Sequence, residues 1–189
     1  MSSLVLVKHS LPTIVPARPA PEWRLSPAGA ARCVALAARR RGFDARAIAS
    51  SVEPKAVETA TLVGQELGIP VELVEGLHEH DRRDATLLGD AEYASAVKAL
   101  FARPQELVFG RETGAAALSR FDAAVTGILT AVPAVDDVIV VAHGTVISLY
   151  VAAHAGLDGW ELWRRLGLPS LVVLDRDDLG LDRVIESVA

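Results

Sequence analysis

The stretch Val5-Leu6-Val7-Lys8-His9-Ser10 decides the fold expected for this chain of 189 residues. It begins as a short apolar run over residues 4–7, with the length and composition of a buried strand, and stops at a cation, an imidazole and a hydroxyl. In open α/β sheets, ligands collect outside the carboxyl ends of the strands. The ending therefore predicts polar groups facing a shared crevice, although a solvated loop would look the same in a single tripeptide.

Two other stretches repeat this arrangement and favour the crevice. Residues 138–142 form a second apolar run that ends in His143-Gly144-Thr145, and a helical pattern follows over residues 146–155. Residues 47–51 form a third short strand candidate, which leads through residues 52–55 into another helical pattern. The sequence thus predicts three strand ends that bring polar side chains to one edge of a sheet.

Lys55 occupies an unusual place in the helix that follows the third strand. Pro54 suits a first helical turn, so Lys55 lies in that turn, where the partial positive charge of the helix favours acidic groups or an anion. A bound anion between the lysine and the free backbone N–H groups would explain this placement. The alternative is that Lys55 points to water and that Glu53 offsets its charge.

In chain order, these motifs resemble the histidine phosphatase superfamily with its phosphoglycerate-mutase-like members. In the first part of the chain, Lys8-His9-Ser10 stands in place of the family's Arg-His-Gly, and Leu25-Ser26-Pro27-Ala28-Gly29 resembles its Leu-Thr-x-x-Gly. Residues 50–60 resemble Ser-Ser-x-x-x-Arg-Ala-x-x-Thr-Ala, and Leu77-His78-Glu79 resembles Leu-x-Glu. Further on, Gly110-Arg111-Glu112-Thr113 with Arg120 resembles Gly-Glu-Ser and its following Arg, and His143-Gly144 resembles the closing His-Gly. Together they span nearly the whole chain.

The resemblance implies a three-layer α/β/α sandwich with a mostly parallel sheet, folded as a single domain over residues 1–189. The alternation of strand and helix patterns in the first part of the chain agrees with parallel strands. Residues 84–132 turn helical without intervening strands, and their apolar stripes are typical of core-facing helices. We expect these residues to form a helical insertion over the active site.

The resemblance also implies phosphoryl transfer through a covalent phosphohistidine. His9 would attack phosphorus as a neutral imidazole, and Glu79 would protonate the leaving oxygen, which requires a pKa raised by burial or by a carboxylate neighbour. His143 would be the third catalytic residue. The implied phosphate-binding residues are Lys8, Ser10, Lys55, Gly144 and Thr145. No metal and no other cofactor is expected.

Two departures from the family pattern affect the expected function. Lysines stand at positions 8 and 55 where the family has arginines, and Ser10 replaces the glycine after the first histidine. Lysine is a point charge, whereas arginine offers a planar fork that matches phosphate. A metal-independent phosphatase acting on a small phosphomonoester is the preferred interpretation. A phosphoglycerate-mutase-type phosphotransferase and a phosphoester-binding protein without turnover stay open as alternatives.

Three further residues are candidates for the rim of the substrate site. Arg24 follows a proline-rich loop over residues 11–21, and either it or Arg18 would add a guanidinium in place of the missing arginines. His80 and Arg82 belong to the polar cluster of residues 77–83 and would contact the leaving group. Histidines and a carboxylate in that cluster could also bind zinc, but no further Cys or His cluster completes such a site.

The composition agrees with one soluble enzyme-sized domain, because 51% of the residues are hydrophobic and 23% are charged. The net charge of −5 argues against a nucleic-acid partner, and the run Arg39-Arg40-Arg41 before Gly42 is typical of a helix end. No apolar run has membrane-spanning length, and the single cysteine, Cys33, fits a reducing compartment. We expect a cytoplasmic protein whose partner is a small phosphate ester; the sequence indicates no oligomeric state.

Overall fold

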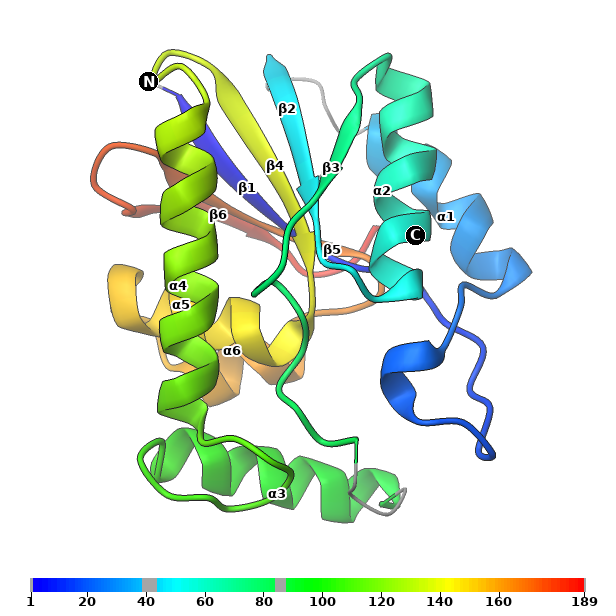
Figure 1. The fold of residues 1–189 in the computed structure, drawn as a ribbon, viewed down its shortest axis with the longest axis vertical. Helices are drawn as coiled ribbons and strands as arrows, with labels where there is room; N and C mark the ends of the chain where they lie inside the picture. The colour runs from blue at the N-terminus through cyan, green and yellow to red at the C-terminus, as the bar shows by residue number, and fades with distance from the viewer. Residues whose placement is uncertain (1, 39–43, 84–87, 189) are drawn as a thin grey trace.

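The computed structural model describes residues 2–38, 44–83 and 88–188, and a six-stranded sheet lies at its centre (Figure 1). The sheet has the order β3-β2-β4-β1-β5-β6. Its strands are β1 (Ser3–Lys8), β2 (Ala45–Ser50), β3 (Val71–Leu73), β4 (Asp137–Ala142), β5 (Ser170–Asp175) and β6 (Leu181–Ile185). The helices are η1 (Ala20–Glu22), α1 (Pro27–Ala38), α2 (Pro54–Leu67), α3 (Asp90–Ala102), α4 (Gly114–Ala131), α5 (Gly144–Ala155) and α6 (Gly159–Arg165).

Most of the sheet is parallel, as predicted. Strand β4 pairs in parallel with β1 and β2, and β2 pairs in parallel with β3. Only β5 and β6 run antiparallel to their neighbours β1 and β5. The carboxyl ends of β1, β2 and β4 therefore meet at one edge, where the sequence places its polar groups.

The alternation of side chains along β1 explains the three layers. Leu4 and Leu6 belong to one buried cluster, with residues of α4, α5 and α6, whereas Val5 and Val7 belong to a second cluster, with residues of α1 and α2. Successive side chains of a strand point to opposite faces, so an uninterrupted apolar run requires cover on both. Figure 1 shows α1 and α2 on one side of the sheet and α4, α5 and α6 on the other. The predicted α/β/α sandwich is confirmed.

Hydrogen bonds that involve residues outside the elements define the start of α1 and the end of β6. The Gly29 N–H donates to Ser26 Oγ at 3.0 Å, so Ser26 caps α1 as its position suggests. The predicted end of that helix at residues 39–42 lies outside the described residues. Strand β6 ends at Ile185, because the following residues bond to the loop before β5, where the Val188 N–H donates to Pro169 O at 2.9 Å.

The described residues 88–132, between β3 and β4, hold two helices, α3 and α4, joined by a loop over residues 103–113, and no strand lies among them. Val97 and Leu100 of α3 are fully buried, as are Phe121 and Val125 of α4, so the apolar stripes face the core as predicted. Helix α3 lies beyond the carboxyl ends of β1, β2 and β4 (Figure 1). Among the described helices, none combines the length and the apolar character that crossing a bilayer would require.

Candidate active site

The parallel pairing of β1 with β4 brings two histidines together. Lys8 is the register partner of Ala142, and the His9 N–H donates to Ala142 O at 3.0 Å, so the next residue of each strand lies at the same edge. The imidazole rings of His9 and His143 have centroids 5.1 Å apart and meet edge to face. Both strand ends thus lie at one edge of the sheet, as the sequence predicts.

His9 has the geometry of a nitrogen nucleophile. Its Nδ1 lies 2.7 Å from the Ser10 carbonyl oxygen, and since a carbonyl only accepts, Nδ1 must carry the proton. Nε2 then holds the lone pair. Burial lowers the pKa of His9 well below its ordinary value, and the neighbouring His143 ring and Lys55 ammonium group oppose its protonation further. The ring is therefore neutral near pH 7.

Ser10 and Thr145, two expected phosphate-binding residues, use their backbone N–H groups for other partners. The Ser10 N–H donates to Thr59 Oγ1 at 3.0 Å, and the Ser10 hydroxyl donates to Gly29 O at 2.8 Å. The Thr145 N–H donates to Glu79 Oε2 at 3.2 Å. In this arrangement Ser10 is bound to helices α1 and α2, and Thr145 is bound to Glu79.

His143 is fully buried and has one unused ring nitrogen. Its Nε2 lies 2.9 Å from Ser51 Oγ, at the end of β2. Its Nδ1 has no hydrogen-bond partner within the described part of the chain. Burial, with Lys55 as the next cause, lowers the pKa of His143 well below its ordinary value. A neutral ring with an unpaired buried nitrogen is suited to a ligand group that completes the bond.

Lys8 lies across the amino end of helix α5. Its Nζ donates to Leu166 O at 2.7 Å, and a Cβ built on Gly144 would lie only 3.1 Å from Lys8 Cε. A side chain at position 144 would therefore displace the lysine. Burial lowers the pKa of Lys8 to about 8, although the nearby charge of Glu79 acts in the opposite direction.

Lys55 points into the protein, and Glu53 accompanies it. Lys55 is 5% exposed, forms an ion pair with Glu53 and donates to Ala20 O at 3.0 Å. The alternative in which Lys55 faces water is excluded by this burial, whereas the charge compensation by Glu53 is present. Glu53 Oε1 also accepts the Glu79 N–H at 2.8 Å and lies 3.7 Å from His143 Nε2.

Glu79 is held between two backbone donors, and its pKa differs from the sequence-based expectation. Its Oε1 accepts the His80 N–H at 2.8 Å, and its Oε2 accepts the Thr145 N–H. Burial is the largest influence and raises the pKa, but His143, Arg82 and the His80 N–H outweigh it, so the net pKa of Glu79 is lowered. The expected raised pKa is therefore absent from the unliganded site, where Glu79 is a carboxylate.

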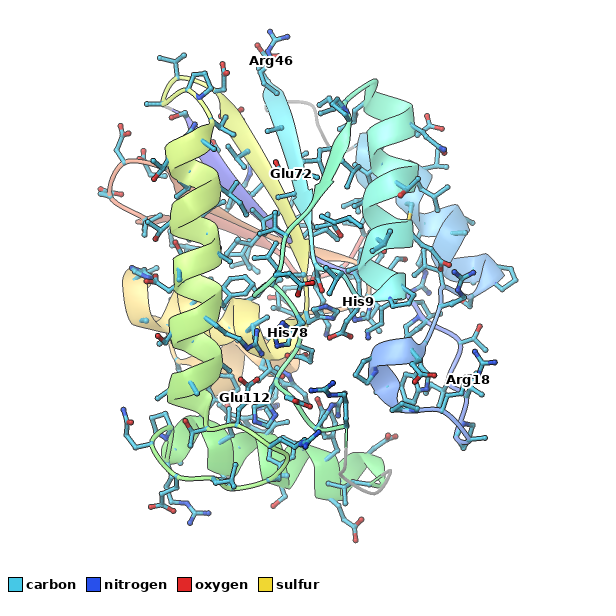
Figure 2. The ribbon with its side chains drawn as sticks, in the orientation of Figure 1. His9, Arg18, Arg46, Glu72, His78 and Glu112 are labelled. Carbon is cyan, nitrogen blue, oxygen red and sulfur yellow. The ribbon has the colours of Figure 1, made fainter. Side chains whose placement is uncertain are left out.

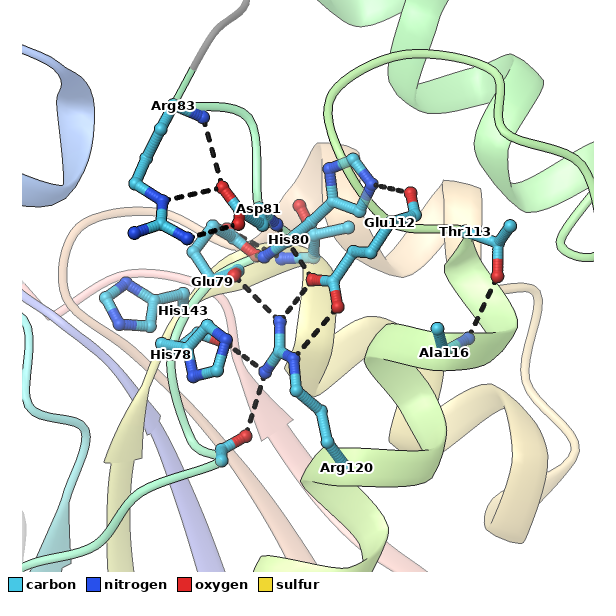
Figure 3. Close-up of polar contacts among 12 residues, drawn as sticks. His78, Glu79, His80, Asp81, Arg83, Glu112, Thr113, Ala116, Arg120 and His143 are labelled. Atoms are coloured by element: carbon cyan, nitrogen blue, oxygen red, sulfur yellow. Dashed lines mark hydrogen bonds and ion pairs between the residues drawn. The ribbon is translucent and has the colours of Figure 1, made fainter.

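Arg120 and Glu112, from the motif that resembles Gly-Glu-Ser, hold the loop that carries Glu79 (Figure 3). Arg120 binds both carboxylate oxygens of Glu112, at 3.1 and 2.5 Å. Its guanidinium also donates to three carbonyl oxygens of the acid loop: Gly76 O at 2.8 Å, His78 O at 2.6 Å and Glu79 O at 2.8 Å. The loop is therefore fixed from helix α4, with Arg120 as its main support.

Two of the three predicted rim residues lie away from the rim. Arg24 is 73% exposed along its side chain and pairs with Glu58 of α2 at 3.4 Å. His80 is 2% exposed, and its Nε2 lies 2.8 Å from Glu112 O. His80 thus joins the support of the acid loop, because the chain turns inward there to meet the segment before α4.

Arg82 is the predicted rim residue that lies beside the acid, and two unpredicted residues accompany it. Arg82 contributes to the lowered pKa of Glu79, and its guanidinium carbon lies 4.1 Å from the ring centroid of Tyr93. Neither Tyr93 nor Glu53 was identified as a site residue from the sequence. Glu53 had a local signal, since it lies two residues before Lys55 in the motif; Tyr93 had none, since α3 reaches the site only through the tertiary fold.

A protein-family comparison identifies the superfamily of the chain. The model of the histidine phosphatase superfamily (branch 1) matches residues 15–184, which is most of the chain. No curated protein sequence matches.

Solved structures share the fold at low sequence identity. A mycobacterial glucosyl-3-phosphoglycerate phosphatase is 21% identical with a TM-score of 0.77, covering 100% of this chain and 99% of that one. A putative alpha-ribazole-5'-P phosphatase from Escherichia coli is 22% identical with a TM-score of 0.74, covering 100% and 98%. A mutant phosphoserine phosphatase from Entamoeba histolytica, solved with phosphoserine, is 20% identical with a TM-score of 0.70, covering 100% and 98%. These similarities concern the fold.

Proposed function

Because the chain belongs to the histidine phosphatase superfamily, we propose that it hydrolyses a small phosphomonoester through a phosphohistidine on His9. The observation that carries the proposal is the histidine pair. His9 is neutral and has its Nε2 lone pair available, while His143, whose ring lies 5.1 Å away, has an unpaired buried Nδ1. Such a pair suits nucleophilic attack on a phosphorus atom held between the two rings.

In the first step, His9 Nε2 attacks phosphorus, the nitrogen–phosphorus bond forms and the bond to the leaving oxygen breaks. Glu79 supplies the proton to that oxygen, as a general acid. The free site holds Glu79 as a carboxylate, with its pKa lowered. A bound phosphate dianion places like charge beside it, which raises the pKa of the carboxyl group and favours its protonation. The substrate thus brings about the acid form that the first step needs.

In the second step, water attacks the phosphohistidine and the nitrogen–phosphorus bond breaks. Glu79, now a carboxylate, takes the proton of the attacking water, and inorganic phosphate leaves. Positive charge around the transferred group stabilises its equatorial oxygens. Lys8, Lys55 and the Gly144 N–H at the amino end of α5 are the groups placed for this role.

We also propose that the protein is located in the cytoplasm, on the evidence of its single cysteine. Cys33 is a buried free thiol in α1. A reduced cysteine fits the cytoplasm, where thiols stay unoxidised.

The test is turnover of p-nitrophenyl phosphate between pH 5 and 8, with a chelator present, for the wild type and His9→Ala. We expect metal-independent release of phosphate that falls by about a thousandfold or more in the variant, because a nucleophile is lost. His154→Ala is the matched control, since His154 pairs with Asp122 at the far end of α5. Rapid quenching should also trap an acid-labile phosphoenzyme in the wild type. Full activity in His9→Ala, or complete loss with chelator, would contradict the proposal.

A further inference from the structure

A cavity of about 560 Å³ lies between the proline-rich loop before α1 and helix α3. The loop side contributes Arg18 and Trp23, and the opposite side contributes Arg82, Tyr93 and Phe109. Figure 2 shows the loop that carries Arg18 at the lower right, α3 along the bottom, and His9 above them nearer the centre of the view. The volume falls in the range of cavities that bind small organic molecules.

Two residues that line this cavity also interact with Lys55 and Glu79 of the proposed site. Ala20, one of its lining residues, accepts the bond from Lys55 Nζ. Tyr93, which also lines the cavity, lies near Glu79. Burial raises the pKa of Tyr93 to about 12, and the charge of Glu79 adds to this effect. A substrate with its phosphate at His9 would therefore extend its leaving group into the cavity.

The lining combines aromatic rings with positive charge. The Arg82 guanidinium lies 4.1 Å from the Tyr93 ring centroid, a cation–π contact that presents a flat charged surface. Within the described residues, neither Arg18 nor Arg82 forms an ion pair with a carboxylate. Arg83, by contrast, is bound by Asp81 at 3.0 and 2.6 Å. Among the described lining residues, Asp90 is the one acid, whereas Arg18, Arg82 and Arg83 all line the cavity.

We infer that this cavity binds the leaving group, and that the substrate is a phosphomonoester whose leaving group carries an aromatic ring and a second negative charge. The ring would lie among Trp23, Tyr93 and Phe109, because such faces stack with planar groups. The second anion, a carboxylate or a further phosphate, would be bound by Arg18 and Arg82. The inference rests on the proposed function only in placing the phosphate beside His9.

The test measures binding of three phosphonates that cannot be hydrolysed: n-propylphosphonate, benzylphosphonate and 4-carboxybenzylphosphonate. Calorimetry on the wild-type protein should show about fivefold tighter binding for the benzyl than for the propyl compound, and about a further tenfold for the carboxybenzyl compound. Equal affinities for the three would overturn the inference. Turnover of the corresponding phosphate esters, which have similar alcohol leaving groups, is measured in parallel.

Variants separate the ring from the charge. Trp23→Leu should reduce the preference for benzyl over propyl, and the double variant Arg18→Gln/Arg82→Gln should remove the preference for the carboxylate. Arg46→Gln is the control, since Arg46 pairs with Asp44 at the distant end of β2 (Figure 2). If the phosphonates bind with the expected order but no ester is hydrolysed, the cavity assignment holds and the proposed hydrolysis fails. Hydrolysis of all three esters with equal kcat/KM would sink the cavity assignment alone.

Discussion

Replacing Arg120 by methionine tests whether the acid loop is fixed from helix α4. Methionine keeps an unbranched apolar side chain but removes the five hydrogen bonds of the guanidinium, two to Glu112 and three to carbonyl oxygens of residues 76–79. The Glu112 carboxylate would keep the Asp81 N–H, which donates at 2.8 Å. The loop that carries Glu79 would thus lose its main connection to the helix.

The cost follows from how far the pair is buried. The side chains of Arg120 and Glu112 are 19% and 15% exposed, so their ion pair lies between a surface pair and a fully buried one. Breaking it should lower the free energy of unfolding by about 3 kcal/mol, which for a domain of this size is a fall in Tm of about 6 to 12 °C. A displacement of the Glu79 backbone by about 1 Å would lower kcat by roughly a hundredfold.

The kinetic constants distinguish positioning from a general loss of structure. In the proposed mechanism Lys8 and Lys55 bind the phosphate from other elements, so KM should change less than threefold by our estimate while kcat falls. Arg103→Met is the matched control, since Arg103 and Glu106 form an exposed pair worth about 0 to 1 kcal/mol. A variant at Arg120 whose kcat stays within about threefold of wild type, with unchanged Tm, would refute the reasoning.

Three further predictions concern charge in the phosphate site. Glu53→Gln removes the carboxylate paired with Lys55, so the inhibition constant of inorganic phosphate should fall about tenfold. A higher inhibition constant would count against this pairing. The pKa of Lys8 is lowered to about 8, and phosphate binds the protonated form, so KM should rise as pH increases through 8, and Lys8→Arg should abolish that rise. For Glu79, kcat should fall at alkaline pH because the first step needs the protonated acid, and a flat profile up to pH 9 would remove Glu79 from that role.

The sequence predicts the sheet edge well because strand ends are local signals. The apolar runs before Lys8 and before His143 are buried on both faces, which fixes them as inner strands. Parallel pairing then leaves His9 and His143 side by side, with no need to know any other contact. The part of the site that is made by strand ends could therefore be derived from the sequence.

The rest of the site depends on contacts between distant segments. The net pKa of Glu79 is set by residues from several elements, among them His143 and Arg82, and burial alone would have given the opposite sign. Tyr93 reaches the acid only because α3 lies beyond the sheet edge. His80 appeared in the sequence as one polar residue among several, and its burial follows from the approach of the segment before α4. Contacts between segments that are far apart in the chain leave no periodic pattern in the sequence.

The positions of the cations explain how the proposed phosphatase can work with Lys8 and Lys55 where the family has arginines. At the phosphate, Lys8 is bound by a carbonyl and Lys55 by Glu53, so both ammonium groups are partly compensated before a substrate arrives. Further out, Arg18 and Arg82 line the cavity without an ion pair among the described residues. Such a site would bind the phosphate group with moderate strength, and its guanidinium groups would bind the leaving group. It would therefore bind the intact ester more strongly than inorganic phosphate. Selectivity would then come from the alcohol part of the substrate, and the hydrolysed phosphate would leave readily.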